Sequence, residues 1–143
     1  MNSKIRLGIL GGGGDSLIGI LHRVAANMFD RYEIVGGVFN PDWKENVNFA
    51  EKIGLSPHRV YQDFETLVKE EVRLPENERM QVISVLTPNF LHYPMAKKLL
   101  ENGFHVICEK PLTTTYEEAL DLKKTQELSN SVFAVTYTYT GYP

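Results

Sequence analysis

The residues with the clearest capacity for chemistry are Glu109 and Lys110, which stand directly before Pro111. A lysine at the edge of a crevice is costly unless it has a partner. In a dry pocket its amine could hydrogen-bond a reacting hydroxyl or carbonyl, with Glu109 as its partner or orienting group. Pro111 would fix the turn and could hold a cis bond. Residue spacing alone favours a simpler interpretation, an ordinary charged turn ahead of a capped helix.

A second stretch suited to chemistry is the run of four glycines at positions 11–14. An apolar run ends there and an amphipathic segment follows, which predicts a strand, a tight turn and a helix. Glycine lets a backbone bend sharply and lets a bulky group approach it. A helix N-terminus at this point would offer free N–H groups to an anion. We therefore expect a dinucleotide pyrophosphate on this turn, and the alternative is a flexible turn without a ligand.

The spacing of these glycines departs from the usual G-x-G-x-x-G pattern of a dinucleotide site. Gly11 and Gly13 supply the first two glycines, but Ser16 stands at the third position and Gly19 follows three residues later. Either Ser16 takes over the close packing of helix on strand, or the loop has a three-residue insertion and Gly19 does so. We expect Gly11, Gly13, Gly14 and Ser16 to hold the pyrophosphate.

Asn40 stands about 20 residues beyond the turn, where an acidic residue usually binds the ribose hydroxyls. An amide can bond a hydroxyl but does not repel a 2′-phosphate, and Lys44 could pair with such a phosphate. Asp42 could serve an NAD ribose instead. The alternative for Asn40 is a helix N-cap with Pro41 at the first helical position, and both roles can coexist. The choice between NAD and NADP stays open.

The remaining polar candidates are histidines and the single cysteine. His92 begins a helix near the expected crevice, where contact with a ligand is about as plausible as a capping or surface role. His22 is interpreted as a core histidine, and Cys108 as a small buried hydrophobe. No group of His, Cys, Asp or Glu has metal-ligand spacing, and no Ser or Cys has the setting of a nucleophile.

Strands that alternate with helices must position these residues. The predicted strands span residues 5–10, 33–39, 81–86, 104–108 and 132–139, with a short extended piece at 59–61. Helices are expected after the glycines, from 40, from 63, from about 91–93 to 101, and from the capping box at 115–118. This alternation predicts a single α/β domain of Rossmann type, a parallel sheet with helices on both faces. In such sheets the ligand crevice lies at the carboxyl ends of the strands, where the special stretches converge.

Composition limits the classes of function. The chain has 143 residues, 43% of them hydrophobic and 23% charged, which suits one globular domain. A net charge of −3 argues against a nucleic-acid surface. No apolar run approaches the ~20 residues of a membrane span, and we expect no signal peptide because the N-terminus leads straight into a predicted strand. A lone cysteine fits a reducing, cytoplasmic compartment.

These motifs together resemble the N-terminal domain of the Gfo/Idh/MocA oxidoreductases, the glucose-fructose oxidoreductase and inositol dehydrogenase family. Four stretches carry the resemblance: the glycine turn with residues 18–23, Thr87-Pro88-Asn89 with His92, residues 108–112, and the closing residues 140–143. The resemblance implies NAD or NADP as cofactor and hydride transfer at a sugar, cyclitol or related hydroxyl. It implies that Lys110 contacts the reacting oxygen or the nicotinamide ribose. Cofactor contacts are then expected from Thr87, Pro88, Asn89, His92, Glu109 and Lys110.

Family members are similar to this chain only over their first part. They continue into a second domain that supplies substrate contacts and much of an oligomer interface. The chain therefore looks truncated, and we expect no useful turnover from it alone, although the full-length parent would be a homo-oligomeric enzyme. A competing hypothesis is a non-catalytic nucleotide sensor in which Lys110 is structural. A third is a domain that binds another adenine nucleotide.

Overall fold

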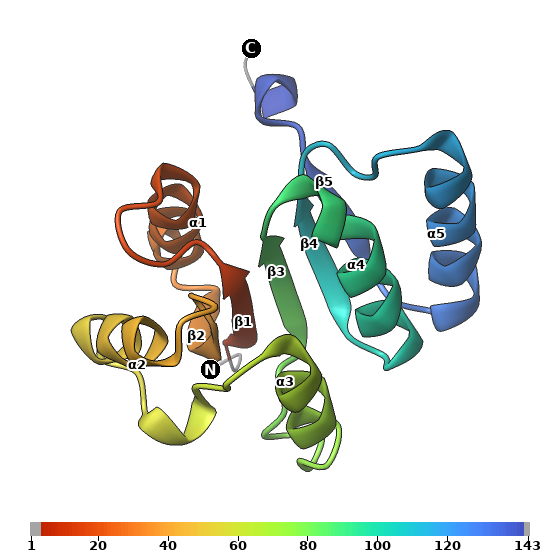
Figure 1. Ribbon diagram of the computed structural model, residues 1–143. Coiled ribbons are helices and arrows are strands. Elements are labelled where there is room, and N and C mark those ends of the chain that lie inside the picture. Colours follow the sequence, from red (N-terminus) through yellow and green to blue (C-terminus); the bar gives the residue numbers. More distant parts are fainter. Residues whose placement is uncertain (1–3, 142–143) are drawn as a thin grey trace.

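The computed structural model describes residues 4–141 and contains one sheet of five parallel strands (Figure 1). The strands are β1 (Ile5–Gly11), β2 (Tyr32–Val38), β3 (Val82–Leu86), β4 (His105–Glu109) and β5 (Phe133–Thr136), in the order β2-β1-β3-β4-β5. The strands pair in parallel because each connection crosses over through a helix. This confirms the expected Rossmann-type α/β sheet, whose strand order reverses between β1 and β3.

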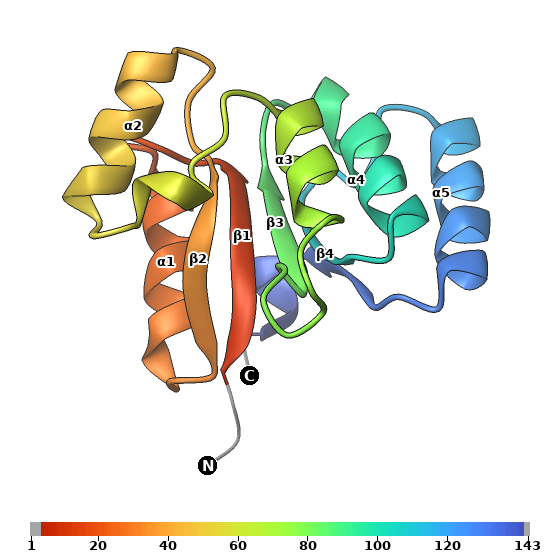
Figure 2. The same ribbon diagram turned by 90° about the horizontal axis from the view of Figure 1, so that it is seen from below.

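Within residues 4–141, five α-helices and two short 3₁₀ segments connect the strands, and a third 3₁₀ segment follows β5. The helices are α1 (Leu17–Met28), α2 (Trp43–Lys52), α3 (Phe64–Glu71), α4 (His92–Glu101) and α5 (Tyr116–Ser129). The 3₁₀ segments are η1 (Pro57–Arg59), η2 (Asn89–Leu91) and η3 (Thr138–Gly141). Figure 2 shows α3, α4 and α5 in a row along one side of the sheet, with α1 on the other side. Within the described residues, no helix is long and apolar enough to cross a membrane.

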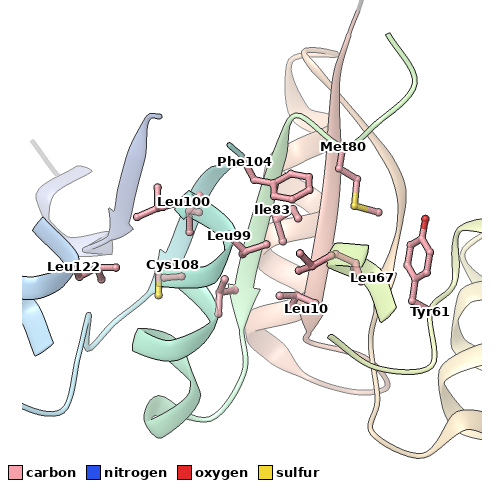
Figure 3. Packing of buried hydrophobic residues seen from close by; sticks show 14 residues of the cluster. Leu10, Tyr61, Leu67, Met80, Ile83, Leu99, Leu100, Phe104, Cys108 and Leu122 are labelled. Carbon is pink, nitrogen blue, oxygen red and sulfur yellow. The ribbon is translucent and has the colours of Figure 1, made fainter. Parts of the chain in front are cut away.

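Alternating strand residues feed two hydrophobic clusters, one on each face of the sheet. On the face covered by α3, α4 and α5, Ile83 of β3 packs with Leu67 and Leu99 in the larger cluster (Figure 3). On the other face, Leu7 and Ile9 of β1 pack with residues of α1 and α2. Because both faces of β1 and β3 are covered, these strands are nearly all apolar, as the sequence indicated.

The short extended piece expected at 59–61 is only partly extended, because Arg59 ends η1 and Val60 alone pairs with β2. Val60 forms an isolated parallel bridge with Gly37 of β2. The carboxylate of Glu71, fully buried, accepts hydrogen bonds from Arg59, from the Tyr61 hydroxyl and from the Met80 amide. These hydrogen bonds attach residues 59–61 to α3. The burial of Tyr61, together with its hydrogen bond to Glu71, raises the pKa of the Tyr61 hydroxyl.

Two local expectations need correction. Asn40 does not cap α2: Asp42 does, because its carboxylate accepts the Glu45 amide at 3.0 Å, and Pro41 therefore lies before the helix. Strand β5 ends at Thr136 instead of reaching 139, because the backbone turns into η3 there. The caps at Asp63 and the capping box of α5 are confirmed. Residues 142–143 of the closing motif lie outside the described residues.

Candidate functional site

A cleft of about 590 Å³ opens at the carboxyl ends of β1, β2 and β3. It lies where the strand order reverses, which is the place for ligands in open α/β sheets. Its lining combines the glycine turn, the end of β2, the start of α3 and the loop after β3. The lining residues are Leu10, Gly11, Gly12, Gly13, Val38, Phe39, Asn40, Pro41, Gln62, Asp63, Phe64, Glu65, Leu86, Thr87, Pro88, Leu91 and Met95.

The glycine turn, residues 11–16, borders this cleft, and its first three residues, 11–13, line it. Gly11, Gly12 and Gly14 all have φ between +57° and +81°, a conformation that residues with a Cβ rarely adopt. A Cβ on Gly13 would lie 2.6 Å from the Phe39 carbonyl oxygen, so the turn passes directly against the end of β2. Among the described residues, the amides of Gly14 and Asp15 have no hydrogen-bond partner. The turn is therefore a backbone cradle with free N–H groups.

The structure resolves the choice between Ser16 and Gly19. Ser16 is the N-cap of α1, and its hydroxyl accepts the Gly19 amide at 3.2 Å. A Cβ on Gly19 would lie 1.8 Å from the Gly12 carbonyl oxygen, which leaves room only for glycine there. Gly19 therefore provides the close approach of helix to strand, and the glycine turn carries the three-residue insertion. Arg23 tightens the same contact by donating to the Gly12 carbonyl oxygen at 2.7 Å.

Asn40 lies in the cleft wall, half-buried, after the end of β2. Its Oδ1 accepts the Asp42 amide at 2.9 Å, which holds the turn and leaves the amide nitrogen as a donor. Lys44 is exposed on the first turn of α2 and does not line the cleft. Asp42 uses its carboxylate for the helix cap. Of these three side chains, only Asn40 therefore reaches the cleft.

Residues 62–65 form a wall of the cleft that sequence reasoning missed. Gln62, Asp63, Phe64 and Glu65 follow residues 59–61 and lead into α3. The Asp63 carboxylate accepts the Thr66 amide at 2.7 Å, and this hydrogen bond lowers the pKa of Asp63. The signal in the sequence was weak, because the extended piece expected at 59–61, just before these residues, is too short to count as a strand.

The loop after β3, residues 87–89 (here the β3 loop), brings Thr87 and Pro88 into the cleft. Asn89 is exposed at the start of η2. His92 is fully buried, with Nδ1 2.7 Å from the Pro111 carbonyl oxygen and Nε2 2.8 Å from the Thr87 carbonyl oxygen. Both ring nitrogens thus contact backbone carbonyl oxygens. This burial and these contacts differ from the surface or helix-capping role considered for His92.

The second chemical feature sits at the end of β4, next to the β3 loop. Glu109 is buried, and its carboxylate accepts hydrogen bonds from Thr136 Oγ1 at 2.6 Å, His22 Nε2 at 3.0 Å and the Lys110 amide at 3.2 Å. Burial acts to raise the pKa of Glu109, but the three hydrogen bonds outweigh it and hold that pKa below its ordinary value. Glu109 therefore fixes the Lys110 backbone, and the Lys110 side chain is left exposed.

The loop after β4, residues 110–114 (here the β4 loop), begins with Lys110 and a cis bond to Pro111, as the sequence allowed. Cys108 is fully buried before it, and burial with the nearby Glu109 charge raises the pKa of its thiol to about 12. Cys108 is therefore a small buried residue, as predicted. His22 belongs to the polar network around Glu109, so its interpretation as a core residue omitted its partner.

A second, smaller cleft of about 310 Å³ lies between α1 and the sheet, where it is lined by residues of several strands, including β3, β4 and β5. His22, Glu109 and Thr136 line its polar part. Ser84 also lines it, and its hydroxyl is the one buried side-chain oxygen of residues 4–141 without a hydrogen-bond partner.

Comparison with known proteins gives a consistent picture. Residues 5–137 match the family described as "Oxidoreductase family, NAD-binding Rossmann fold". The chain is 32% identical over 142 residues to the uncharacterized oxidoreductase YfiI of Bacillus subtilis, covering 99% of this chain and 36% of that protein. It is 28% identical over 131 residues to scyllo-inositol 2-dehydrogenase (NADP(+)) IolW of the same organism, covering 92% of this chain and 32% of that protein.

Two solved structures of an inositol dehydrogenase homolog from Azotobacter vinelandii share the fold over 99% of this chain. The complex with NAD⁺ has a TM-score of 0.94 at 39% identity and is covered to 36% of its length. The complex with NADH and myo-inositol has a TM-score of 0.93 at 40% identity and is covered to 37%. The chain thus spans about a third of the length of the proteins it matches.

Proposed function

Because the chain belongs to the Gfo/Idh/MocA oxidoreductases, of which it carries the NAD-binding Rossmann domain, we propose that its cleft binds the cofactor for hydride transfer at a polyol or sugar hydroxyl. The observation that carries this proposal is the glycine turn that borders the cleft. Its free amides and its lack of Cβ atoms suit the pyrophosphate, the part of a dinucleotide that needs both close approach and hydrogen-bond donors.

The cofactor is proposed to lie along the carboxyl edge of the sheet, with its adenosine half toward β2 and its nicotinamide half toward the β3 loop. In this proposal Gly11, Gly13 and Gly14 hold the pyrophosphate, while Ser16 caps the helix that completes the site. Asn40 and the wall at residues 62–65 take the adenosine half, because they lie on the β2 side of the turn. The β3 loop takes the nicotinamide half, with Thr87 and Pro88 in the lining and Asn89 beside them.

Lys110 is the residue we propose for catalysis. It is exposed at the end of β4 and its backbone is held by Glu109, so its amine is free to reach toward the nicotinamide half. The cofactor supplies the hydride acceptor or donor when it is bound. Lys110 then hydrogen-bonds the reacting oxygen and moves its proton as the carbon gains or loses hydride. The complex of the Azotobacter protein with myo-inositol supports a polyol as the substrate class.

The choice between NAD and NADP depends on the adenosine half. Asn40 can donate its amide to a ribose hydroxyl and carries no charge to repel a 2′-phosphate. Lys44 is exposed on α2 and offers only a solvated charge. We propose NAD as the preferred cofactor, with NADP tolerated.

Catalysis by this chain is proposed to need further chain that closes over the nicotinamide half. The matched proteins are about three times as long, and a homo-oligomeric enzyme of that size is our proposal for the working protein. A cytoplasmic location is proposed as well, since the single cysteine is a buried free thiol.

A calorimetric titration of the chain with NADH, NADPH and ATP tests the proposal. We expect NADH to bind, NADPH to bind more weakly, and ATP not to compete. Gly13→Ala should abolish NADH binding, because the added methyl would lie 2.6 Å from the Phe39 carbonyl oxygen. Gly103→Ala is the control for general destabilisation, since its Cβ meets no atom within 4 Å and only its positive φ of 77° opposes the change, away from the cleft lining. If neither nicotinamide cofactor bound, the proposal would fail.

The competing function is a nucleotide sensor without catalysis, in which Lys110 is structural. The exposed lysine argues against it, since a structural lysine would be expected to pair. Lys110→Ala in a complete enzyme separates the two functions. Loss of turnover with unchanged cofactor affinity supports catalysis, and unchanged turnover supports another role for Lys110.

A further inference from the structure

His92 joins two loops that are distant in sequence. It is the first residue of α4, and its ring is fully buried between the β3 loop and the β4 loop. Nε2 contacts the Thr87 carbonyl oxygen at 2.8 Å, and Nδ1 contacts the Pro111 carbonyl oxygen at 2.7 Å. One rigid ring therefore spans the ends of β3 and β4, where the proposed nicotinamide half lies.

The chemistry of the two contacts decides the state of the ring. Both partners are carbonyl oxygens, which only accept hydrogen bonds. A neutral imidazole has one N–H and could satisfy only one of them, so two bonds require N–H at both nitrogens. The geometry thus assigns a positively charged ring, whose charge is directed at two backbone dipoles.

The charged side chains of the surrounding segments are engaged elsewhere or exposed and do not pair with the His92 ring. Glu109 at the end of β4 is engaged by Thr136, His22 and the Lys110 amide. Lys110 is exposed. On α4 and α5, Lys97 pairs with Asp121 on the outer side. Among residues 4–141, no ion pair joins His92 to a carboxylate, so the two carbonyl oxygens are what hold the ring.

These two hydrogen bonds hold backbone that lies beside the proposed site. Thr87 directly precedes Pro88, and Pro111 directly follows Lys110, so each bond fixes the backbone next to a proposed cofactor or substrate contact. A rigid ring between them sets the separation of the two loops. Loss of the ring would leave each loop attached to its own strand but free to move relative to the other.

We propose that His92 is a positioning residue and not a ligand contact: its doubly protonated ring clamps the β3 loop to the β4 loop and so orients Asn89 and Lys110 toward the nicotinamide end. The orienting role rests on the proposed function. The clamp itself is a property of the chain alone, so the two can be tested separately.

The clamp is tested in the wild-type chain by nitrogen NMR of ¹⁵N-labelled histidine at neutral pH. We expect both ring nitrogens of His92 to carry protons that exchange slowly with water, as buried hydrogen bonds require. The exposed His58 is the internal reference, with fast-exchanging protons. A His92 ring with a single N–H would overturn the clamp, and no variant is needed for this measurement.

The orienting role is tested by calorimetry with NADH and with ADP-ribose, which lacks the nicotinamide. His92→Phe keeps a buried planar ring and removes both donors, and His58→Phe is the matched control. We expect the NADH affinity of His92→Phe to fall about tenfold while ADP-ribose binds within about twofold of wild type, since only the nicotinamide half is loosened. His92→Gln, which keeps a donor, should lose less NADH affinity.

Equal weakening of both ligands in these variants would show general destabilisation and overturn the orienting role. If the wild-type chain bound neither NADH nor ADP-ribose, the proposed function would fail together with the orienting role. The ring protons would then still decide the clamp.

Discussion

The two halves of the cleft edge are built in opposite ways. The glycine turn after β1 is shaped by missing side chains: Gly13 approaches the end of β2, and Gly19 approaches Gly12. The ends of β3 and β4 are shaped by polar side chains, with His92 and Glu109 each bonding groups from more than one segment. The first half is therefore a rigid backbone surface, whereas the second depends on a hydrogen-bonded network. This difference suits a part that binds an invariant anion and a part that must place a reacting group.

The largest expected effect is on the glycine half. Gly19→Ala would place a methyl 1.8 Å from the Gly12 carbonyl oxygen, so α1 must move away from β1. We expect a loss of about 3 kcal/mol in the free energy of unfolding, as for severe overpacking. Chemical denaturation measures it.

Gly14→Ala is the control in the same turn. Its Cβ meets no atom within 4 Å, and only the positive φ of 57° opposes the change. A loss of about 1 kcal/mol is expected. Equal losses of unfolding free energy in Gly19→Ala and Gly14→Ala would contradict the claim that close backbone approach shapes the glycine turn.

The next effect concerns the network half. His22→Leu removes one of three hydrogen bonds to the buried Glu109 carboxylate, and a loss of about 1.5 kcal/mol in the free energy of unfolding is expected. A double-mutant cycle with Glu109→Gln measures the coupling of the two residues, for which we expect about 1 kcal/mol. Additive losses would show that the two side chains act independently. His58→Leu, on an exposed 3₁₀ segment, should cost almost nothing.

A smaller effect tests whether polar side chains matter in the glycine half. Asp42→Ala removes the N-cap of α2 and should lower the free energy of unfolding by about 1 kcal/mol. Asn40→Ala removes only the bond to the Asp42 amide and should cost less. If Asn40→Ala cost more than Asp42→Ala, the assignment of the cap would be wrong.

The pH dependence is expected to be the smallest effect, because it concerns one carboxyl. The pKa of Glu109 is lower in the folded chain than its ordinary value of 4.5. Its contribution to stability is therefore complete above that value and is lost as the pH falls through the folded pKa. The difference in unfolding free energy between wild type and Glu109→Gln should shrink below about pH 4. A constant difference down to pH 2 would contradict the lowered pKa.

The contrast between the halves also explains what the sequence could predict. The alternation of strands and helices, the glycine turn and the caps at Asp63 and Thr115 follow from local patterns, because glycine, cap and periodicity signals lie within a few residues. The assignment of the helix start to Asn40 failed by two residues, since Asn and Asp are both good caps.

The network half was beyond local reasoning. His22 and Glu109 are 87 residues apart, and His92 and Pro111 are 19 apart, so neither contact leaves a trace in spacing. His22 was therefore interpreted as a core histidine without a named partner, and His92 as a ligand contact, a helix cap or a surface residue. The cleft wall at residues 62–65 was missed for a related reason, because a single bridge at Val60 is too short to mark a strand. Side chains that act through long-range contacts require the fold to be known first.

The central claim, that one cofactor spans both halves, is tested most directly by amide NMR of the ¹⁵N-labelled chain during titration with NADH. The account predicts shifts at the amides of Gly11, Gly13, Gly14 and Asn40 and also at Thr87, Asn89 and Lys110. ADP-ribose should shift the first group alone. Shifts confined to the smaller cleft, at Ser84, Ile107 and Thr138, or no shifts in either group, would contradict it.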